Sequence, residues 1–548
     1  MRTATRDRCP TPAALLGLAL LALLALPAFA ATASARPGGA GKGTQPNILV
    51  VMTDDMAQTD LQFMPTVRRK LAQKGTKFTN AIDSFPLCCP ARATFISGQY
   101  PHNHGVIGNF APYGWYGMKS RGNTLPAWLD DAGYRTAAIG KWLNGYGALD
   151  AHGEVPKGFD TWRGLLDVSA YDYFNFVMNK DGKLRSWGDE EFARKLVEFA
   201  EIEVDDEPDT LATIFAELGR LFGPPPYDYW GSERPRDYSP DVTGKVTTRL
   251  VRAERHSRKP FFIWWSPASP HREDVSTTLM GRPGPDPRAP FRYRDESEEL
   301  TLPRGPSFNN QGTGPIPENM EAATPLDQAD IDQLELDYQG RAGSMMAVDD
   351  RVADIIKTLR ETHQLKNTVI MFLSDNGWLQ GEHRIPGDKF LPYDESLKVP
   401  LIIRGPGIPR GEKVTGQVSN VDFAPTLLDL ADARAGRAVD GLSLVPTMDD
   451  PASAPERALG IEAPAPLFAG AIPVNAWDRP YEGVRTDRYT FVEYTESGDR
   501  QLFDRESDPH ELHNLAGDPA YAAVEARLAE LTAELSACAG RECSRIKP

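Results

Sequence analysis

Short, uninterrupted apolar runs recur along the chain, and polar residues follow each of them. The runs cover residues 47–52, 136–140, 260–265 and 368–373. Apolar runs of this length are typical of strands buried on both faces of a parallel sheet. The polar residues after such strands lie where open α/β sheets place their functional sites.

Helical spacing occupies the stretches between these runs. It predicts helices over residues 64–74, where Gly75 ends the pattern, and over residues 334–362. Alternating strands and helices predict an α/β fold with a large, mostly parallel sheet flanked by helices. Residues 189–226 combine acidic amphipathic character, a second helical stretch and three prolines. We interpret them as an inserted surface elaboration.

The pattern changes near residue 450. Residues 449–466 are rich in Pro and Ala and are predicted to form a linker. Residues 483–494 alternate as antiparallel strands do, and residues 520–535 have the spacing of a closing helix. We therefore expect a large domain over residues 46–450 and a smaller C-terminal domain over residues 451–548.

The first 35 residues have the pattern of a secretory signal peptide. Three arginines precede an apolar segment, residues 13–26, that is short for a membrane span, and small residues follow it. Residues 36–45, rich in Gly, would then be a flexible linker. The pattern predicts a secreted protein, with an uncleaved membrane anchor as the alternative; no later segment resembles a membrane span.

The composition is that of an ordinary globular protein. Of 548 residues, 41% are hydrophobic and 25% charged, and the formal net charge is -16. A negative surface repels phosphate backbones, so nucleic acid is not an expected partner. A small anionic substrate is still compatible, because a local basic pocket can act against the field of the whole protein.

Cysteine is rare in the chain, which has five. Cys538 and Cys543 lie close together near the C-terminus, where an exported protein can join them in a disulfide; two free thiols are the alternative. Cys88 and Cys89 are neighbours, and a structural disulfide between neighbours would be strained. This second pair needs another explanation.

Oxygen ligands for a metal ion follow two of the apolar runs. Asp54 and Asp55 come after the first run, and Asp375 and Asn376 come after the last. Hard divalent cations prefer such ligands, and a set without His or Cys favours Ca²⁺, or Mg²⁺, over zinc. Paired Asp residues are also common in caps and turns, but their recurrence after two strands favours a metal site.

Cys88 begins the segment Cys88-Cys89-Pro90-Ala91-Arg92, just before an apolar stretch. A cysteine at a helix start gains acidity from the helix dipole and from a nearby arginine. Taken alone, these residues make Cys88 a candidate thiol nucleophile, with a buried pair of thiols as the alternative. Arg92 lies one helical turn further on and is expected on the same face.

The same segment resembles the Cys-x-Pro-x-Arg modification signature of the sulfatases, and the resemblance covers nearly all of the chain after the predicted signal. The other segments that carry it are Thr53-Asp54-Asp55, Thr94-Phe95-Ile96-Ser97-Gly98, Gly140-Lys141-Trp142, Ser374-Asp375-Asn376-Gly377 and Asp508-Pro509-His510-Glu511-Leu512. Leu87-Cys88-Cys89-Pro90 and Gly140-Lys141-Trp142-Leu143-Asn144-Gly145 are most similar to the glucosamine-6-sulfatase branch. The resemblance implies an alkaline-phosphatase-like sandwich that hydrolyses a sulfated carbohydrate or an aryl sulfate.

In the sulfatases the first cysteine of the signature is oxidised to formylglycine, whose hydrated aldehyde is the nucleophile. The resemblance therefore implies that a formylglycine-generating enzyme modifies Cys88. It also implies that Asp54, Asp55, Asp375, Asn376 and modified Cys88 bind one Ca²⁺. Asp375 would in addition accept the proton of the attacking hydroxyl.

The resemblance assigns roles to five further residues. Arg92 would hold the formylglycine hydroxyl and the metal carboxylates, and Lys141 and Lys389 would bind sulfate oxygens as point charges. His271, predicted at a strand end, is the expected general acid for the leaving oxygen, with a capping role as the alternative. His383 is expected to line the substrate pocket.

One position departs from the family pattern. Many arylsulfatases have a His two residues after the lysine matched by Lys141, where it serves the elimination of sulfate, and this chain has Leu143. Two other functions stay open. One is a phosphate or phosphonate monoester hydrolase of the same superfamily. The other is a catalytically silent, carbohydrate-binding homologue, against which the intact set of catalytic residues argues.

Overall fold

The structure is a computed structural model. It describes residues 45–109, 112–147, 153–167, 169–200, 233–273, 284–464 and 475–548, with a few single positions between 216 and 223. The predicted signal peptide and residues 36–44 lie outside the described residues, as does most of 201–226 in the predicted insertion. Gln45–Pro548 forms one compact unit.

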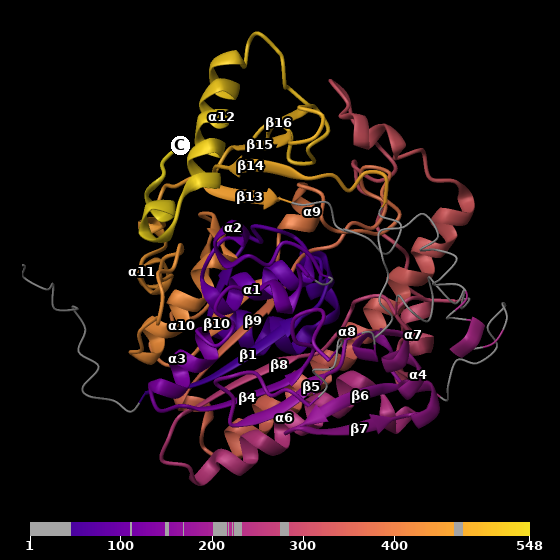
Figure 1. Cartoon of the computed structure of the whole chain (residues 1–548), viewed down its shortest axis with the longest axis vertical. Helices are drawn as coiled ribbons and strands as arrows, with labels where there is room; N and C mark the ends of the chain where they lie inside the picture. The colour runs from indigo at the N-terminus through magenta and orange to yellow at the C-terminus, as the bar shows by residue number, and fades with distance from the viewer. Residues whose placement is uncertain are drawn as a thin grey trace, which may run out of the picture. The chain divides into compact units, whose positions relative to one another are not determined.

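A ten-stranded sheet forms the centre of this unit (Figure 1). Its middle strands are parallel and are, in spatial order, β9 (Thr368–Ser374), β1 (Asn47–Thr53), β8 (Phe261–Ser266), β4 (Arg135–Gly140) and β5 (Thr161–Leu165). The first four of these contain the apolar runs, because a strand covered on both faces has no polar side to alternate with. The predicted α/β fold is confirmed.

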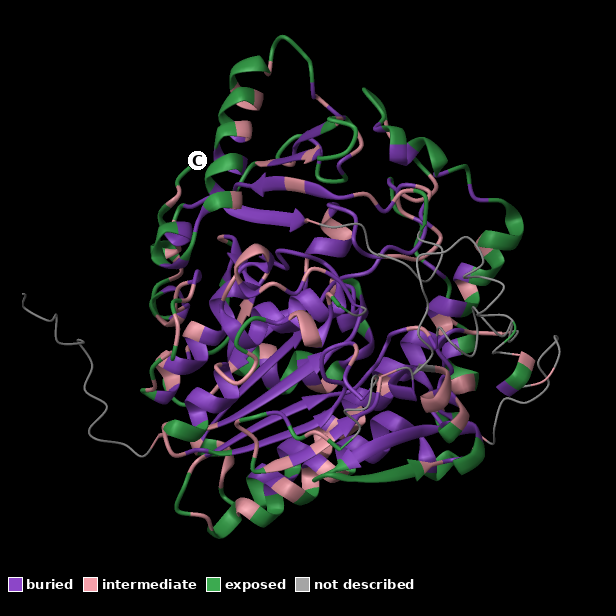
Figure 2. Cartoon of the chain, in the orientation of Figure 1, coloured by how far each residue is buried: buried purple, intermediate pink, exposed green. Residues whose placement is uncertain are grey.

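Further strands extend the sheet on both sides, and the sheet is mixed because most of them pair antiparallel with their neighbours. Next to β9 lie β10 (Leu401–Arg404), β2 (Thr76–Phe78) and β11 (Glu412–Val414), and next to β5 lie β6 (Phe176–Lys180) and β7 (Lys183–Trp187). The central strands are buried, whereas the edge strand β7 is largely exposed (Figure 2). A separate parallel pair consists of β3 (Ala81–Ile82) and β12 (Val418–Ser419).

Helices cover both faces of the sheet. Ile48, Val50 and Met52 of β1 pack toward the layer of α1 (Cys88–Ser97), α3 (Leu125–Asp131) and α10 (Phe423–Ala431). Leu49 and Val51 face the opposite layer, with α6 (Ser239–Ala253) and α8 (Gln328–Glu361). The alternation follows from the two-residue period of a strand. Other α-helices in the described part of the chain are α2 (Pro101–His104), α4 (Glu190–Ala200), α7 (Arg294–Glu298), α9 (Asp394–Leu397), α11 (Val445–Asp449) and α12 (Ala522–Ala537).

The C-terminal region forms the predicted antiparallel sheet and closing helix. The strands are β13 (Leu459–Ala463), β14 (Tyr481–Arg485), β15 (Tyr489–Tyr494) and β16 (Arg500–Asp504), and α12 follows them. The predicted linker is wrong in its second half, which contains β13. Alternate apolar residues of β13, Leu459 and Ile461, belong to one buried cluster with Phe85 and Leu87, which lie between β3 and α1. This packing orders the strand.

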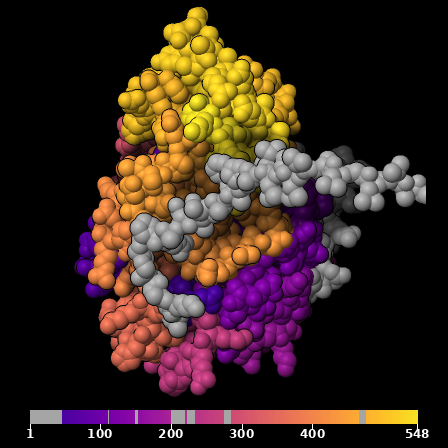
Figure 3. Space-filling view, turned by 90° about the vertical axis from the view of Figure 1, so that its left-hand side faces the viewer, coloured from indigo at the N-terminus to yellow at the C-terminus, as the bar shows by residue number. Residues whose placement is uncertain are grey.

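Residues near the C-terminus adjoin the segment around α10 and α11, as the yellow and orange surfaces of Figure 3 show. Asp440 accepts a hydrogen bond from Gly540 N at 2.7 Å, beside the bonded sulfurs of Cys538 and Cys543. The domain boundary near residue 450 stays a prediction. Within the described residues, no helix combines the length and the apolarity that crossing a membrane requires.

Candidate active site

The carboxyl ends of four neighbouring parallel strands lie at one edge of the central sheet. The residues that follow β9, β1, β8 and β4 at this edge are, in order, Asp375 and Asn376, Asp54 and Asp55, the loop to His271, and Lys141. Parallel pairing brings these distant parts of the chain together, as the apolar runs predicted.

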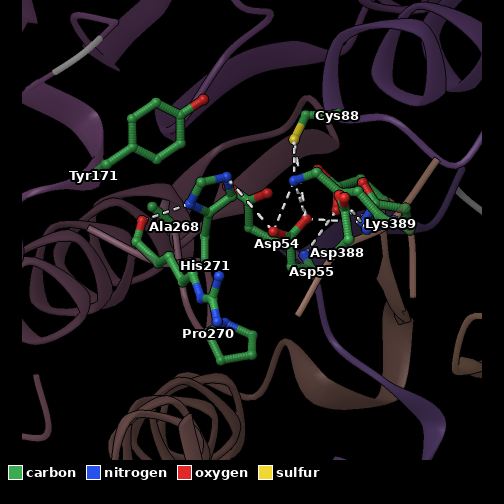
Figure 4. A network of polar contacts seen from close by, with 12 residues as sticks. Asp54, Asp55, Cys88, Tyr171, Ala268, Pro270, His271, Asp388 and Lys389 are labelled. Atoms are coloured by element: carbon green, nitrogen blue, oxygen red, sulfur yellow. Dashed lines mark hydrogen bonds and ion pairs between the residues drawn. The ribbon is translucent and has the colours of Figure 1, made fainter. Parts of the chain in front are cut away.

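Cys88 is the first residue of α1 and is fully buried. Its Sγ lies 3.0 Å from Lys389 Nζ and 3.9 Å from Asp55 Oδ1 (Figure 4). Burial raises the pKa of the Cys88 thiol to about 12, although the charges of Lys141 and Lys389 act to lower it. The expectation of an acidic thiol is therefore wrong for the unmodified side chain, because lost solvation outweighs the nearby cations.

Arg92, one turn into α1, connects several strand ends. Its Nε donates to Asp375 Oδ2 at 2.8 Å, and its Nη1 donates to Ser266 Oγ at 2.7 Å and to the Lys141 carbonyl at 3.0 Å. Its Nη2 lies 3.7 Å from Asp54 Oδ2. The guanidinium is buried, so it orients these groups where water cannot compete for them.

Two buried lysines face the carboxylates. Lys141 Nζ lies 2.7 Å from Asp54 Oδ2, and Lys389 Nζ donates to the two carboxylate oxygens of Asp55 at 2.5 and 2.7 Å. Burial alone would lower the pKa of each lysine, but the nearby carboxylates raise it above the ordinary value. Both ammonium groups are therefore charged and stand beside Cys88.

His271 presents one ring nitrogen to this group. Its Nδ1 lies 2.6 Å from the carbonyl oxygen of Arg272, which can only accept, so Nδ1 carries a proton. Its Nε2 lies 3.5 Å from Asp55 Oδ2, and its ring stacks on Tyr171 with centroids 4.3 Å apart (Figure 4). The carbonyl and the stacked ring thus hold Nε2 toward the carboxylates.

Four of these side chains form what we call the acidic cluster. Ligand atoms of Asp54, Asp55, Cys88 and His271 all lie within 4.8 Å of one another. In the described chain Asp54 Oδ1 and Asn376 Oδ1 are buried and have no hydrogen-bond partner, while Asp54 Oδ2 pairs with Lys141. Buried polar atoms are nearly always bonded. The acidic cluster can therefore hold a metal ion, and its carboxylates suit a hard cation.

Asp375 and Asn376 lie against the acidic cluster. Asp375 Oδ1 accepts a hydrogen bond from Asp55 N at 3.1 Å, and Asn376 Nδ2 donates to Asp55 Oδ1 at 2.8 Å. Burial and the charge of Asp54 raise the pKa of Asp375 to about 6, against the influence of Arg92. A carboxylate with such a pKa can exchange a proton near neutral pH.

His383 has surroundings of a different kind. Its ring stacks on Tyr393 with centroids 3.7 Å apart, and its Nε2 lies 3.8 Å from Glu395 Oε2. The ring and polar contacts described for His383 include no residue of the acidic cluster. Its predicted contact with substrate stays a prediction.

A sequence model described as sulfatase matches residues 46–433, which include both strand ends with the paired acidic residues and the whole of α1. The chain belongs to the sulfatase family. A second model, described as N-sulphoglucosamine sulphohydrolase, C-terminal, matches residues 381–537. The predicted family and the predicted class of enzyme, a sulfuric ester hydrolase, are thereby confirmed.

Known proteins resemble this sulfatase over most of its length. N-acetylglucosamine-6-sulfatase of Capra hircus is 29% identical over 518 residues, which cover 87% of this chain and 81% of that protein. A structure solved in complex with its substrate D-glucosamine-2-N,6-O-disulfate has a TM-score of 0.62 and 22% identity, and covers 90% of this chain and 97% of that chain. The phosphonate monoester hydrolase of Agrobacterium radiobacter has a TM-score of 0.59 and 21% identity, with coverage of 88% and 94%. These structures share the fold of the sulfatase.

Sequence reasoning missed Tyr171, which stands between two of the predicted site residues. Lys141 Nζ lies 4.6 Å from the centroid of its ring, and the same ring stacks on His271. Asn144 Nδ2 donates to its hydroxyl at 2.6 Å. Tyr171 belongs to none of the recognised segments, and a lone tyrosine in a turn has no local signal of function.

Proposed function

We propose that this sulfatase is a secreted enzyme that hydrolyses the sulfate ester of a sugar related to N-acetylglucosamine-6-sulfate. Formylglycine made from Cys88 is the nucleophile and Ca²⁺ is the metal. The observation that carries the proposal is the place of Cys88 at the start of α1, with Sγ beside Lys389 Nζ and Asp55. A buried thiol with a pKa of about 12 is a poor nucleophile, which supports a modified side chain.

Asp54, Asp55, Asp375, Asn376 and modified Cys88 would hold the ion. The oxygens of Asp54 and Asn376 that accept no hydrogen bond from the described chain support this ligand set. A divalent ion supplies polarisation of the sulfate oxygens and favours ionisation of the attacking hydroxyl. Ca²⁺ is preferred, with Mg²⁺ as the alternative, because carboxylate and amide oxygens dominate the set.

The protein's own residues move the protons. Hydrated formylglycine offers one hydroxyl to attack sulfur and a second that permits release of sulfate, so one difficult displacement becomes two easier steps. Asp375 accepts the proton of the attacking hydroxyl, and the hydrogen bond from Arg92 Nε to its Oδ2 keeps the carboxylate in place. In its doubly protonated form His271 donates the Nε2 proton to the leaving sugar oxygen and becomes neutral, while its Nδ1–H stays bonded to the Arg272 carbonyl.

Lys141 and Lys389 bind the sulfate oxygens. Their ammonium groups are charged and buried, and Lys141 contacts Asp54 while Lys389 contacts Asp55. A sugar sulfate is preferred to an aryl sulfate because a glucosamine-6-sulfatase is among the relatives of the chain and the model described as N-sulphoglucosamine sulphohydrolase, C-terminal, matches residues 381–537. Secretion is supported by the pattern of residues 1–35, which lie outside the described residues, and by the Cys538–Cys543 pair, since disulfides persist in oxidising compartments.

Mass spectrometry of the peptide around Cys88 tests the nucleophile. Protein made together with a formylglycine-generating enzyme should have an aldehyde at Cys88 and a thiol at Cys89. An unmodified Cys88 in fully active protein would contradict the proposal.

Rates on matched esters test the substrate class. We expect kcat/KM for N-acetylglucosamine-6-sulfate to exceed that for the equivalent phosphate and for a phenyl phosphonate ester. The phosphonate hydrolase, which has the same fold, is the specific alternative. A higher kcat/KM on the phosphonate would select that alternative, and no turnover of any ester would favour the silent homologue.

A further inference from the structure

Arg341 lies in the middle of α8 and is buried, with 1% of its surface exposed. Its guanidinium points to the two loops that leave β1 and β8. Nη2 donates to the carbonyl of Asp55 at 2.7 Å, and Nη1 donates to the carbonyl of Pro270 at 3.2 Å. The residue after Pro270 is His271, so one side chain holds the backbones of two adjoining parts of the acidic cluster.

The backbone of Asp55 needs such support. Its φ is +61°, in the left-handed region that residues other than glycine seldom adopt. Conformations of this kind cost free energy and persist only where surrounding contacts over-determine them. The hydrogen bond from Arg341 to the Asp55 carbonyl is such a contact, and it lies on the opposite end of the residue from the carboxylate that meets Lys389 and His271.

A second link runs from Arg341 to the lysine beside Cys88. The guanidinium carbon of Arg341 lies 5.6 Å from the ring centroid of Trp378, and Lys389 Nζ lies 5.5 Å from the same centroid. Both distances suit a cation–π contact. Asp60 holds the arginine itself, since its Oδ2 accepts from Nη2 at 2.8 Å.

We propose that Arg341 is a positioning residue that sets the Asp55 carboxylate and the His271 loop at the spacing that metal binding and turnover require. The inference rests on the proposed function of the same site. Arginine suits this task because its planar fork donates in fixed directions to several acceptors at once, whereas lysine offers a single ammonium group. The helix therefore acts on the site through the backbone, without a contact to substrate.

Two variants, Arg341→Met and Arg341→Lys, test the proposal. For each we would measure the Ca²⁺ affinity by calorimetry, kcat in steady-state assays, and the melting temperature of the metal-free protein. Residues that support metal ligands typically change affinity by about 10- to 100-fold. A misplacement of about 1 Å can cost about 100-fold in rate. We expect Arg341→Met to weaken Ca²⁺ affinity at least about tenfold and to lower kcat by more than KM rises, with Arg341→Lys between it and the parent.

Arg457→Met is the matched control. Arg457 is also buried and ion-paired, with Asp422 as its partner, and has no described contact with the acidic cluster. It should lower the melting temperature and leave the Ca²⁺ affinity and kcat of the folded protein unchanged. If Arg341→Met behaves like this control, Arg341 is merely structural and the proposal fails.

Asp60→Asn keeps the test decisive if Arg341→Met does not fold. It preserves the shape of Asp60 and removes the charge that holds Arg341, so a smaller loss of Ca²⁺ affinity and kcat is expected. Parental values in a folded Asp60→Asn and a folded Arg341→Lys would overturn the inference while leaving the proposed function intact. A parent protein that binds no Ca²⁺ would overturn both.

Discussion

Asp54 and Asp422 are both fully buried aspartates, but their surroundings differ. Asp422, before α10, accepts hydrogen bonds from Leu442 N at 2.8 Å and Ser419 N at 3.0 Å, and it pairs with Arg457. Asp54, after β1, pairs through Oδ2 with Lys141 at 2.7 Å, but its buried Oδ1 has no hydrogen-bond partner in the described chain.

The difference is the one expected between a charge that serves the fold and a charge that can bind a ligand. Burying a charge is costly unless partners and hydrogen bonds replace its hydration. At Asp422 the chain supplies them itself. At Asp54 the oxygens are incompletely satisfied, which makes them available to a ligand from outside the chain.

The largest effect is expected at Cys88, the proposed nucleophile, which belongs to the acidic cluster together with Asp54. Cys88→Ser should abolish multiple turnover without unfolding the protein, because the introduced hydroxyl can attack sulfur but has no second hydroxyl to release sulfate. Steady-state assays and thermal melts would check this. Cys89→Ala is the control and should keep both formylglycine and activity. Turnover near the parent rate in Cys88→Ser would rule out the formylglycine assignment.

Loss of the metal should come next. EDTA should lower activity, and Ca²⁺ should restore it better than Zn²⁺. Bound Ca²⁺ should stabilise the folded protein by about 2.7 kcal/mol at a hundredfold excess over Kd.

Asp54→Ala should weaken Ca²⁺ binding, but its activity should respond to added Ca²⁺. Asp375→Ala should not recover fully, because it also lacks the proton acceptor, a role worth about 10²- to 10⁴-fold. Kinetics and calorimetry across a Ca²⁺ titration would separate the two, and full activity in protein shown by elemental analysis to be metal-free would refute the site.

Asp422→Asn tests the satisfied side of the comparison. It removes one partner of a buried ion pair and leaves Arg457 uncompensated, so a loss of about 3–5 kcal/mol in the free energy of unfolding is expected. Asp54→Asn also breaks a buried ion pair, with Lys141, but it should cost metal-free protein less, because Oδ1 of Asp54 has no bond to lose and Arg92 keeps its hydrogen bond to Asp375. Urea denaturation of both variants in EDTA would measure this. Equal losses would remove the proposed distinction.

The smallest effect is expected on the pH dependence of stability, at the half-buried His102. Like Asp422, this residue has its polar atoms paired by the chain itself. Its Nδ1 lies 2.9 Å from Glu462 Oε2 and its Nε2 lies 3.0 Å from the Cys538 carbonyl. Burial lowers its pKa, but the bonds and charge of Glu462 outweigh burial and raise it to about 9. Because the folded pKa is above the unfolded value, the stabilisation is complete below about pH 6.5 and disappears as pH rises through about 9.

Melting temperatures of parent and His102→Gln protein should therefore differ most near pH 6 and converge near pH 10. Glu462→Gln should give the same dependence, because it removes the other half of the pair. A difference that does not change with pH would mean that His102 is neutral in the folded protein.

Much of the fold and of the site could be predicted because the decisive patterns are local. The apolar runs before Asp54 and Asp375 identify buried strands, and the four-residue step from Cys88 to Arg92 needs only a helix. The helix predicted over residues 64–74 is observed as short helical turns, Val67–Leu71 and Ala72–Lys74. The β13 strand was missed because packing against Phe85 and Leu87, rather than local composition, orders it.

The sequence by itself identified the candidate residues for the chemistry and predicted that several of them end parallel strands, since run length and spacing are properties of neighbouring residues. Only the tertiary structure decided which of them meet. It placed Lys389 against Asp55 and Cys88, gave His383 contacts with Tyr393 and Glu395 instead, and brought Tyr171 and Arg341 to the site. Strand pairing and helix packing join residues hundreds of positions apart, and no local pattern records that proximity.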